Sequence, residues 1–200
     1  MYRLIAFFVI MRNTAIINAI YELLIAYNPS SLAKKDADSF KYLIGQLVRQ
    51  YDIPKANRHI SKEAQNLWGR LTKDNITNYY YNRPVPCNNI TTSITCNLYT
   101  GSCKTGVSRT LNNGDNFKFR QLFHEDHVVP VSLIVQELLS LSQPISVTAI
   151  ENTLQQMHMC ILLKEEDRSI GRTRGRTLNF KANVVNVYNN NDIYIMPLQY

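Results

Sequence analysis

Apolar residues recur at helical spacing over most of the first third of this chain, and this pattern restricts the fold more than any other feature. The spacing of three to four residues extends over 14–27, over 38–51 and from Ser61 to Leu71. Ser61 has a side chain suited to a helix N-cap. Each segment therefore predicts an amphipathic helix that must bury one face, and we expect a mainly helical N-terminal part.

Residues 73–116 differ in composition from the segments around them. They are rich in Asn, Thr, Ser, Gly and Pro, and their apolar residues follow no clear period. Such a stretch predicts loops and short strands. The tyrosines and Arg at 79–83 have the chemistry to stack on bases and hold phosphates, although a half-buried strand is the simpler interpretation.

Elements of both kinds are predicted beyond residue 116, which makes the chain an α+β protein. Alternating apolar residues or short apolar runs predict strands at 117–124, 158–163 and 192–198. Helix starts are predicted after Pro130, at a capping box of Thr148 and Glu151, and at the acidic turn 164–167.

Two histidines and two carboxylates occupy four consecutive positions within FHEDHVVPV, residues 123–131. A zinc hydrolase is one interpretation, but the HExxH motif needs histidines four residues apart on a helix. Here the histidines are three residues apart and stand at the end of a predicted strand. A salt-bridged strand end on the surface is the plainest alternative, so the residues that follow must decide whether the cluster is catalytic.

Asp126, His127 and Pro130 fit the pattern Asp-His-x-x-Pro, which resembles the first strand of HNH, or ββα-metal, endonucleases. The resemblance covers roughly residues 117–170 and is greatest to HNH-type restriction endonucleases of bacteria. It implies a ββα-metal-like catalytic core in which Asp126 is a metal ligand. It also implies that His127 is the general base, and a neutral imidazole can act in this way at physiological pH.

The same resemblance calls for a second strand opened by His or Asn and for a helix that supplies another metal ligand about nine residues later. His158 opens the predicted strand 158–163 and would take the middle role of the motif, with Asn152 as its rival. Asp167 lies nine residues after His158 and Glu166 lies eight after it. Both are candidate ligands, and Asp167 is preferred. Carboxylate ligands suit Mg²⁺, or Mn²⁺, better than zinc.

Positive charge is concentrated just after this predicted helix start. Four arginines within nine residues suit a loop that grips phosphates, and they are Arg168, Arg172, Arg174 and Arg176. His124 is a further candidate for contact with the phosphate backbone. The whole chain has a net charge of +7 and contains 12 tyrosines, which favours a polyanionic partner such as nucleic acid.

The sequence thus predicts a metal-dependent endonuclease that hydrolyses double-stranded DNA, in the class of type II site-specific deoxyribonucleases. We expect residues 1–116 to form a helical and loop-rich scaffold and DNA-recognition region, and residues 117–200 to form the catalytic region, within one compact unit. A palindromic target would call for a homodimer. Two alternatives remain open: a non-catalytic DNA-binding or regulatory protein, and a nuclease or toxin directed at RNA.

The remaining features concern covalent links and location. The four cysteines contain no CxxC pair, which argues against a structural zinc site. Glycosylation-type triplets at Asn75 and Asn89 would suit a secreted, disulfide-bonded protein, but the apolar run 4–11 is too short for a membrane span and lacks a cleavage site. We therefore expect a cytoplasmic protein without membrane contact or a small-molecule cofactor. Met11 is a second candidate for the true start, with the first ten residues either an artefact outside the protein or a buried first strand.

Overall fold

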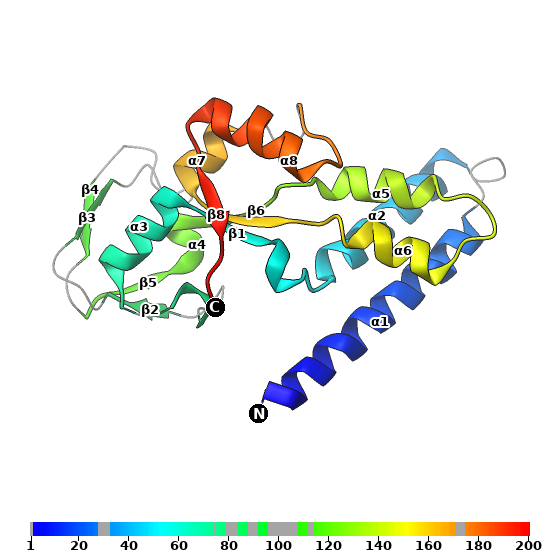
Figure 1. Cartoon of the computed structure of the whole chain (residues 1–200), viewed down its shortest axis with the longest axis horizontal. Helices are drawn as coiled ribbons and strands as arrows, with labels where there is room; N and C mark the ends of the chain where they lie inside the picture. Colours follow the sequence, from blue (N-terminus) through cyan, green and yellow to red (C-terminus); the bar gives the residue numbers. More distant parts are fainter. Residues whose placement is uncertain are drawn as a thin grey trace.

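The computed structural model describes residues 2–27, 33–73, 75–78, 84–87, 92–95, 108–111, 114–170 and 175–200. Within these ranges helices combine with one four-stranded sheet and a pair of two-stranded sheets (Figure 1). The predicted α+β class is therefore confirmed. None of the helices in these ranges is long and apolar enough to cross a membrane.

The central sheet has the strand order β6-β7-β1-β8. Its strands are β1 (Arg58–Ser61), β6 (Phe123–His127), β7 (Met159–Leu163) and β8 (Ile195–Pro197). The edge strand β6 is antiparallel to β7, whereas β1 is parallel to β7 and antiparallel to β8. The sequence pattern does not predict β1, because four residues are too few to show an alternation. Since β1 lies between β7 and β8, the regions 1–116 and 117–200 share one sheet.

Four helices pack around one end of this sheet. They are α1 (Tyr2–Ala26), α2 (Lys34–Gln50), α5 (Val131–Leu139) and α6 (Val147–Leu154). Their apolar side chains meet in one core that includes Ile20, Ile44, Val48, Ile134, Leu138 and Ile150. In Figure 1, α1 projects from this end with the N-terminus directed away from the sheet.

Helix α1 begins well before the segment in which the periodicity predicts it. The apolar run 4–11 belongs to α1, so its interpretation as a buried first strand is wrong. The run shows no alternation of apolar and polar residues, and no Pro or Gly separates it from the helical pattern of 14–27. The start of α2 is likewise four residues earlier than predicted, at Lys34.

A second core surrounds Trp68 of α3 (Lys62–Leu71). The single strand expected at 117–124 is wrong, because the chain forms β5 (Asn116–Lys118), one helical turn α4 (Phe119–Leu122) and then β6. This turn stacks Phe119 on Phe123 with ring centroids 4.9 Å apart. A straight strand would hold the two residues about 13 Å apart. The turn thus lets both rings pack against Trp68, at 6.2 and 5.7 Å.

The face of the sheet opposite to the Trp68 core is covered by segments that follow β7. They are α7 (Lys164–Ser169), α8 (Phe180–Asn183) and the helical turns η4 (Val184–Tyr188) and η5 (Asn189–Asn191). Their apolar side chains pack against Val128, Cys160 and Leu162. The predicted strand at 158–163 and the helix with an acidic first turn are confirmed as β7 and α7.

Short elements complete the described part of the chain. They are η1 (Lys55–Asn57), η2 (Ile76–Asn78), β2 (Pro84–Pro86), β3 (Thr92–Thr95) and β4 (Ser108–Leu111). β2 pairs with β5, and β3 pairs with β4. Short strands within 73–116 agree with the prediction from composition, whereas the tyrosines at 79–83 lie outside the described residues.

Side-chain caps explain where two helices begin. Ser61 Oγ accepts a hydrogen bond from the backbone N–H of Ala64 at 3.0 Å, as predicted for the start of α3. The predicted capping box of α6 is wrong, because Ser146 is the N-cap and accepts from the N–H of Ala149 at 3.1 Å. Thr148 is the second residue of α6, so it does not occupy the N-cap position from which a capping box is formed.

Candidate metal centre

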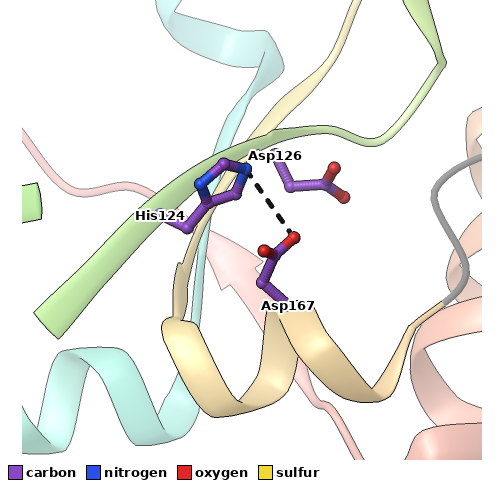
Figure 2. Close-up of side chains that lie close together, drawn as sticks. All are labelled: His124, Asp126 and Asp167. Carbon is purple, nitrogen blue, oxygen red and sulfur yellow. Dashed lines mark ion pairs between the residues drawn. The ribbon is translucent and has the colours of Figure 1, made fainter. Parts of the chain in front are cut away.

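The edge strand β6 and helix α7 bring one imidazole and two carboxylates together. His124 and Asp126 lie two positions apart on β6, so side-chain alternation directs them to one face. Because α7 follows β7 directly and β7 is antiparallel to β6, the first turn of α7 carries Asp167 to the same place. Potential ligand atoms of the three side chains all lie within 4.8 Å of one another. Figure 2 shows them converging, with His124 Nε2 3.7 Å from Asp167 Oδ1.

Asp126 is held from behind by two donors that lie far away in the sequence. Arg176 Nη1 donates to Asp126 Oδ2 at 2.8 Å and also to the backbone carbonyl of His127 at 2.8 Å. The Tyr188 hydroxyl donates to the same carboxylate oxygen. Both donors act on Oδ2, so Asp126 has one fixed oxygen and can offer Oδ1 to a ligand. Burial, and then the charge of Asp126, raise the pKa of Tyr188, which keeps its hydroxyl a donor.

The prediction that Arg176 contacts DNA phosphates is wrong. Its side chain is only 1% exposed, so it is not accessible to a phosphate outside the protein. Its charge instead neutralises Asp126 in the interior. Nε and Nη2 of the same guanidinium are also buried, and they have no hydrogen-bond partner among the residues that the structure describes. Arg168 lies exposed on α7 and stays a candidate for phosphate contact. Arg172 and Arg174 lie outside the described residues.

The two acidic candidates on α7 have different surroundings. Glu166 Oε2 accepts from the Ser61 hydroxyl at 2.6 Å and from the backbone N–H of Leu163 at 2.8 Å. Burial raises the pKa of Glu166, and these two hydrogen bonds oppose the rise. Glu166 thus ties the start of α7 to β1, whereas Asp167 faces His124 and Asp126. The structure brings Asp167 to the cluster and leaves Glu166 outside it.

His127 lies on the other side of β6 from the three clustered residues. Alternation along β6 directs its side chain to the face opposite His124 and Asp126. Burial lowers the pKa of His127, Asp126 raises it, and the positive charge of Arg49 on α2 lowers it further. The imidazole brought to the carboxylates is therefore His124, which was predicted only as a contact to the DNA backbone.

His158 belongs to a separate group of aromatic rings. His158 Nδ1 lies 3.1 Å from His59 Nε2, and the ring of Phe180 stacks on His158 with centroids 3.9 Å apart. Burial, and then His59, lower the pKa of His158 to about 4, and burial lowers the pKa of His59. The structure gives His158 no place in the cluster of His124, Asp126 and Asp167.

Two residues that shape these sites, Tyr188 and His59, were missed by the sequence reasoning. Tyr188 lies 62 residues after Asp126 in an apolar and Asn-rich segment, and His59 lies in the short strand β1. Neither stretch contains a motif, so only the folded chain shows their contacts. Arg176 was selected for its charge, but it was predicted to contact phosphates at the surface, whereas its side chain is buried. Asn152, the rival of His158, is exposed on α6.

Comparisons with protein-family models, with curated proteins and with solved structures each found no match. Function must therefore be inferred from the geometry of the chain itself.

Proposed function

We propose that this protein is a metal-dependent endonuclease that hydrolyses phosphodiester bonds in double-stranded DNA. The observation that carries the proposal is the convergence of His124, Asp126 and Asp167 within 4.8 Å. A carboxylate pair with an adjacent imidazole provides a cation site and a proton acceptor in one place, and phosphodiester hydrolysis needs both.

The donor set fits a hard divalent cation. Asp126 and Asp167 would hold Mg²⁺ or Mn²⁺ through carboxylate oxygens, the ligands that these ions prefer. The charges of Asp126 and Asp167 with that of Arg176 sum to −1, so the cluster retains negative charge for a cation. When bound, the cation would act as a Lewis acid toward the phosphate and the leaving oxygen.

The protein residues then have distinct tasks. His124 is 41% exposed and stands beside Asp167, so it can accept the proton of the attacking water, and Asp167 stabilises the resulting imidazolium. Arg176 and Tyr188 hold Asp126 in one orientation, as partners behind a metal ligand commonly do. His124 therefore replaces His127 in the proposal as the general base.

The arrangement of elements also supports the proposal. An antiparallel pair, β6 and β7, is followed directly by α7, and the candidate ligands lie on β6 and α7. This is the order of elements that the resemblance to ββα-metal endonucleases implies, although α5 and α6 separate the two strands. Site-specific cleavage of a palindromic sequence by a homodimer is part of the same proposal.

The test is cleavage of supercoiled plasmid by the full chain with Mg²⁺, with Mn²⁺ and with EDTA. We expect nicked and linear products only with a metal ion. His124→Ala should lower the rate by about 10² to 10⁴, as loss of a general base typically does. The affinity for Mn²⁺, measured by calorimetry, should stay within about threefold of wild type, because His124 acts on the proton and leaves the carboxylates in place.

His127→Ala is the matched control, since it removes an imidazole from the other face of the same strand. It should retain cleavage close to wild type. An inactive His127→Ala with an active His124→Ala would return the role of base to His127. No cleavage by wild type with either ion would contradict the nuclease proposal, and DNA binding without cleavage would then favour a non-catalytic DNA-binding protein.

A further inference from the structure

A groove of about 330 Å³ lies between α2 and α5, on helices that carry none of the three clustered residues. In Figure 1 these helices lie toward the end of the molecule from which α1 projects. The floor of the groove is apolar and comes from α5, with Val131, Val135 and Leu139. Its opposite side comes from α2, with Lys41, Tyr42 and Arg49. Nothing in the proposed catalytic chemistry uses this groove.

The charge of the groove is entirely positive among the described residues that line it. Lys41 and Arg49 are both exposed, and none of these lining residues is acidic. Lys41 lies 3.7 Å from Asp38, but both side chains are more than half exposed, so the pair is weak. Arg49 Nη1 donates to the backbone carbonyl of Gly45 at 3.1 Å, a neutral acceptor that leaves the guanidinium charge available.

Gly45 leaves room for the Arg49 head group beside α2. A Cβ atom at position 45 would lie 3.3 Å from Arg49 Nη1 and 3.8 Å from Val135 Cγ2. A glycine within a helix costs about 1 kcal/mol relative to alanine. Without a side chain at position 45, the guanidinium lies against the backbone of α2 while Arg49 lines the groove.

The groove also offers groups suited to a nucleotide. Tyr42 is 65% exposed, so its ring is free to stack on a base. Ser132 and Gln136 of α5 add neutral hydrogen-bonding groups to the lining. The lining residue Val131 begins α5 and follows the last residue of β6, His127, by four positions, so this end of the groove is close in sequence to the edge strand.

We propose that the α2–α5 groove binds the backbone of a DNA strand, with Lys41 and Arg49 contacting phosphates and Tyr42 stacking on a base. A positive lining without carboxylates, combined with an exposed tyrosine, fits a nucleic acid better than a neutral ligand. The inference extends the proposed function, because it states where the substrate strand is held, but DNA binding can be measured without cleavage.

The test is fluorescence anisotropy with a labelled DNA duplex and its single strand, at several salt concentrations in Ca²⁺, using the full chain. Lys41→Ala/Arg49→Ala should weaken binding and lower the slope of log affinity against log salt by about 1.8 for the duplex, since each phosphate contact contributes about 0.9. Tyr42→Ala should weaken binding to the single strand more than to the duplex, because unpaired bases are free to stack.

Lys62→Ala/Arg70→Ala is the matched control, because it removes two exposed cations from α3 instead. It should lower the slope by less than half as much. Equal changes in the two double variants would overturn the proposal, because net charge alone would then explain the loss. Tighter binding of poly-glutamate than of DNA in the same salt would also overturn it, in favour of an acidic protein partner.

Hydrolysis of bis(p-nitrophenyl) phosphate separates this proposal from the nuclease proposal. This small diester does not need the groove, so Lys41→Ala/Arg49→Ala should hydrolyse it at the wild-type rate. If wild type hydrolyses neither substrate but its DNA binding depends on Lys41 and Arg49, the groove proposal stands alone. If wild type cleaves DNA and the double variant binds DNA as wild type does, the groove proposal is wrong and the nuclease proposal stands.

Discussion

Two groups that contain histidine lie on the same face of the central sheet, but their environments differ. Asp126 on the edge strand and His59 in the interior strand both pair with Cys160, so alternation directs them to one face. At the edge, His124 stands beside two carboxylates and remains accessible to solvent. In the interior, His59 contacts His158 and both rings stack on Phe180.

The comparison teaches that the surroundings of a histidine determine what its imidazole can do. The edge group concentrates negative charge and leaves oxygen and nitrogen atoms available, which suits cation binding and proton transfer. The interior group has stacked rings and lowered pKa values, which suits packing by neutral imidazoles.

The largest expected effect comes from breaking the buried ion pair behind the edge group. Asp126→Asn should lower the free energy of unfolding by about 3 to 5 kcal/mol, because it leaves the buried charge of Arg176 without a counter-ion. Asp167→Asn is the matched control, since its carboxylate is 25% exposed and pairs with His124. That variant should change stability by less than about 1 kcal/mol. Urea denaturation measures both.

Arg176→Met tests the same ion pair from the cationic side. Added to Asp126→Asn, it should recover a large part of the lost stability, because no charge then remains buried. Equal losses in Asp126→Asn and Asp167→Asn, or no recovery in the double variant, would contradict a structural role for the Arg176 contact.

A smaller effect is expected from protonation of the interior group. The folded-state pKa of His158 lies near 4, below the ordinary histidine value of about 6.5. The stabilisation is therefore complete above pH 6.5 and is lost as pH falls toward 4. We expect a loss of about 1 to 2 kcal/mol once screening of the partly exposed His158 ring is allowed for. The measurement is the free energy of unfolding at pH 7 and pH 4.5.

His158→Phe should flatten this pH dependence, because phenylalanine keeps a ring against Phe180 but does not titrate. His124→Ala should leave the dependence close to that of wild type. A pH dependence that persists in His158→Phe would show that acidic loss of stability comes from other groups.

The smallest expected effect distinguishes the two acids on α7. Glu166→Ala should lower stability by about 1 kcal/mol, because it removes the acceptor at the start of α7. It should leave the Mn²⁺ affinity nearly unchanged. Asp167→Ala should instead weaken Mn²⁺ binding by at least about tenfold, the loss expected when the surroundings of a metal are disturbed. The reverse result in calorimetry would make Glu166 the ligand.

Local patterns determined much of the fold in advance. The spacing of apolar residues predicted α2, α3 and α5, and a short apolar run followed by acids predicted β7 and α7. These elements follow from interactions between near neighbours in the chain, namely helical periodicity and side-chain caps. Asp126 and Asp167 were also selected from the sequence, and the structure brings them together. Their selection depended on the resemblance to ββα-metal endonucleases, which implies an acid at Asp126 and another about nine residues after His158.

Tertiary structure decided which face each side chain occupies and which charges are buried. The helical turn α4 separates β5 from β6, so the alternation of side chains begins again at Phe123. Along β6 it directs His124 to the face of the carboxylates and His127 to the opposite face. Arg176 and Tyr188 reach Asp126 only because the C-terminal segment crosses back over the sheet. Such contacts between distant segments depend on burial and packing in the whole fold, and no local spacing encodes them.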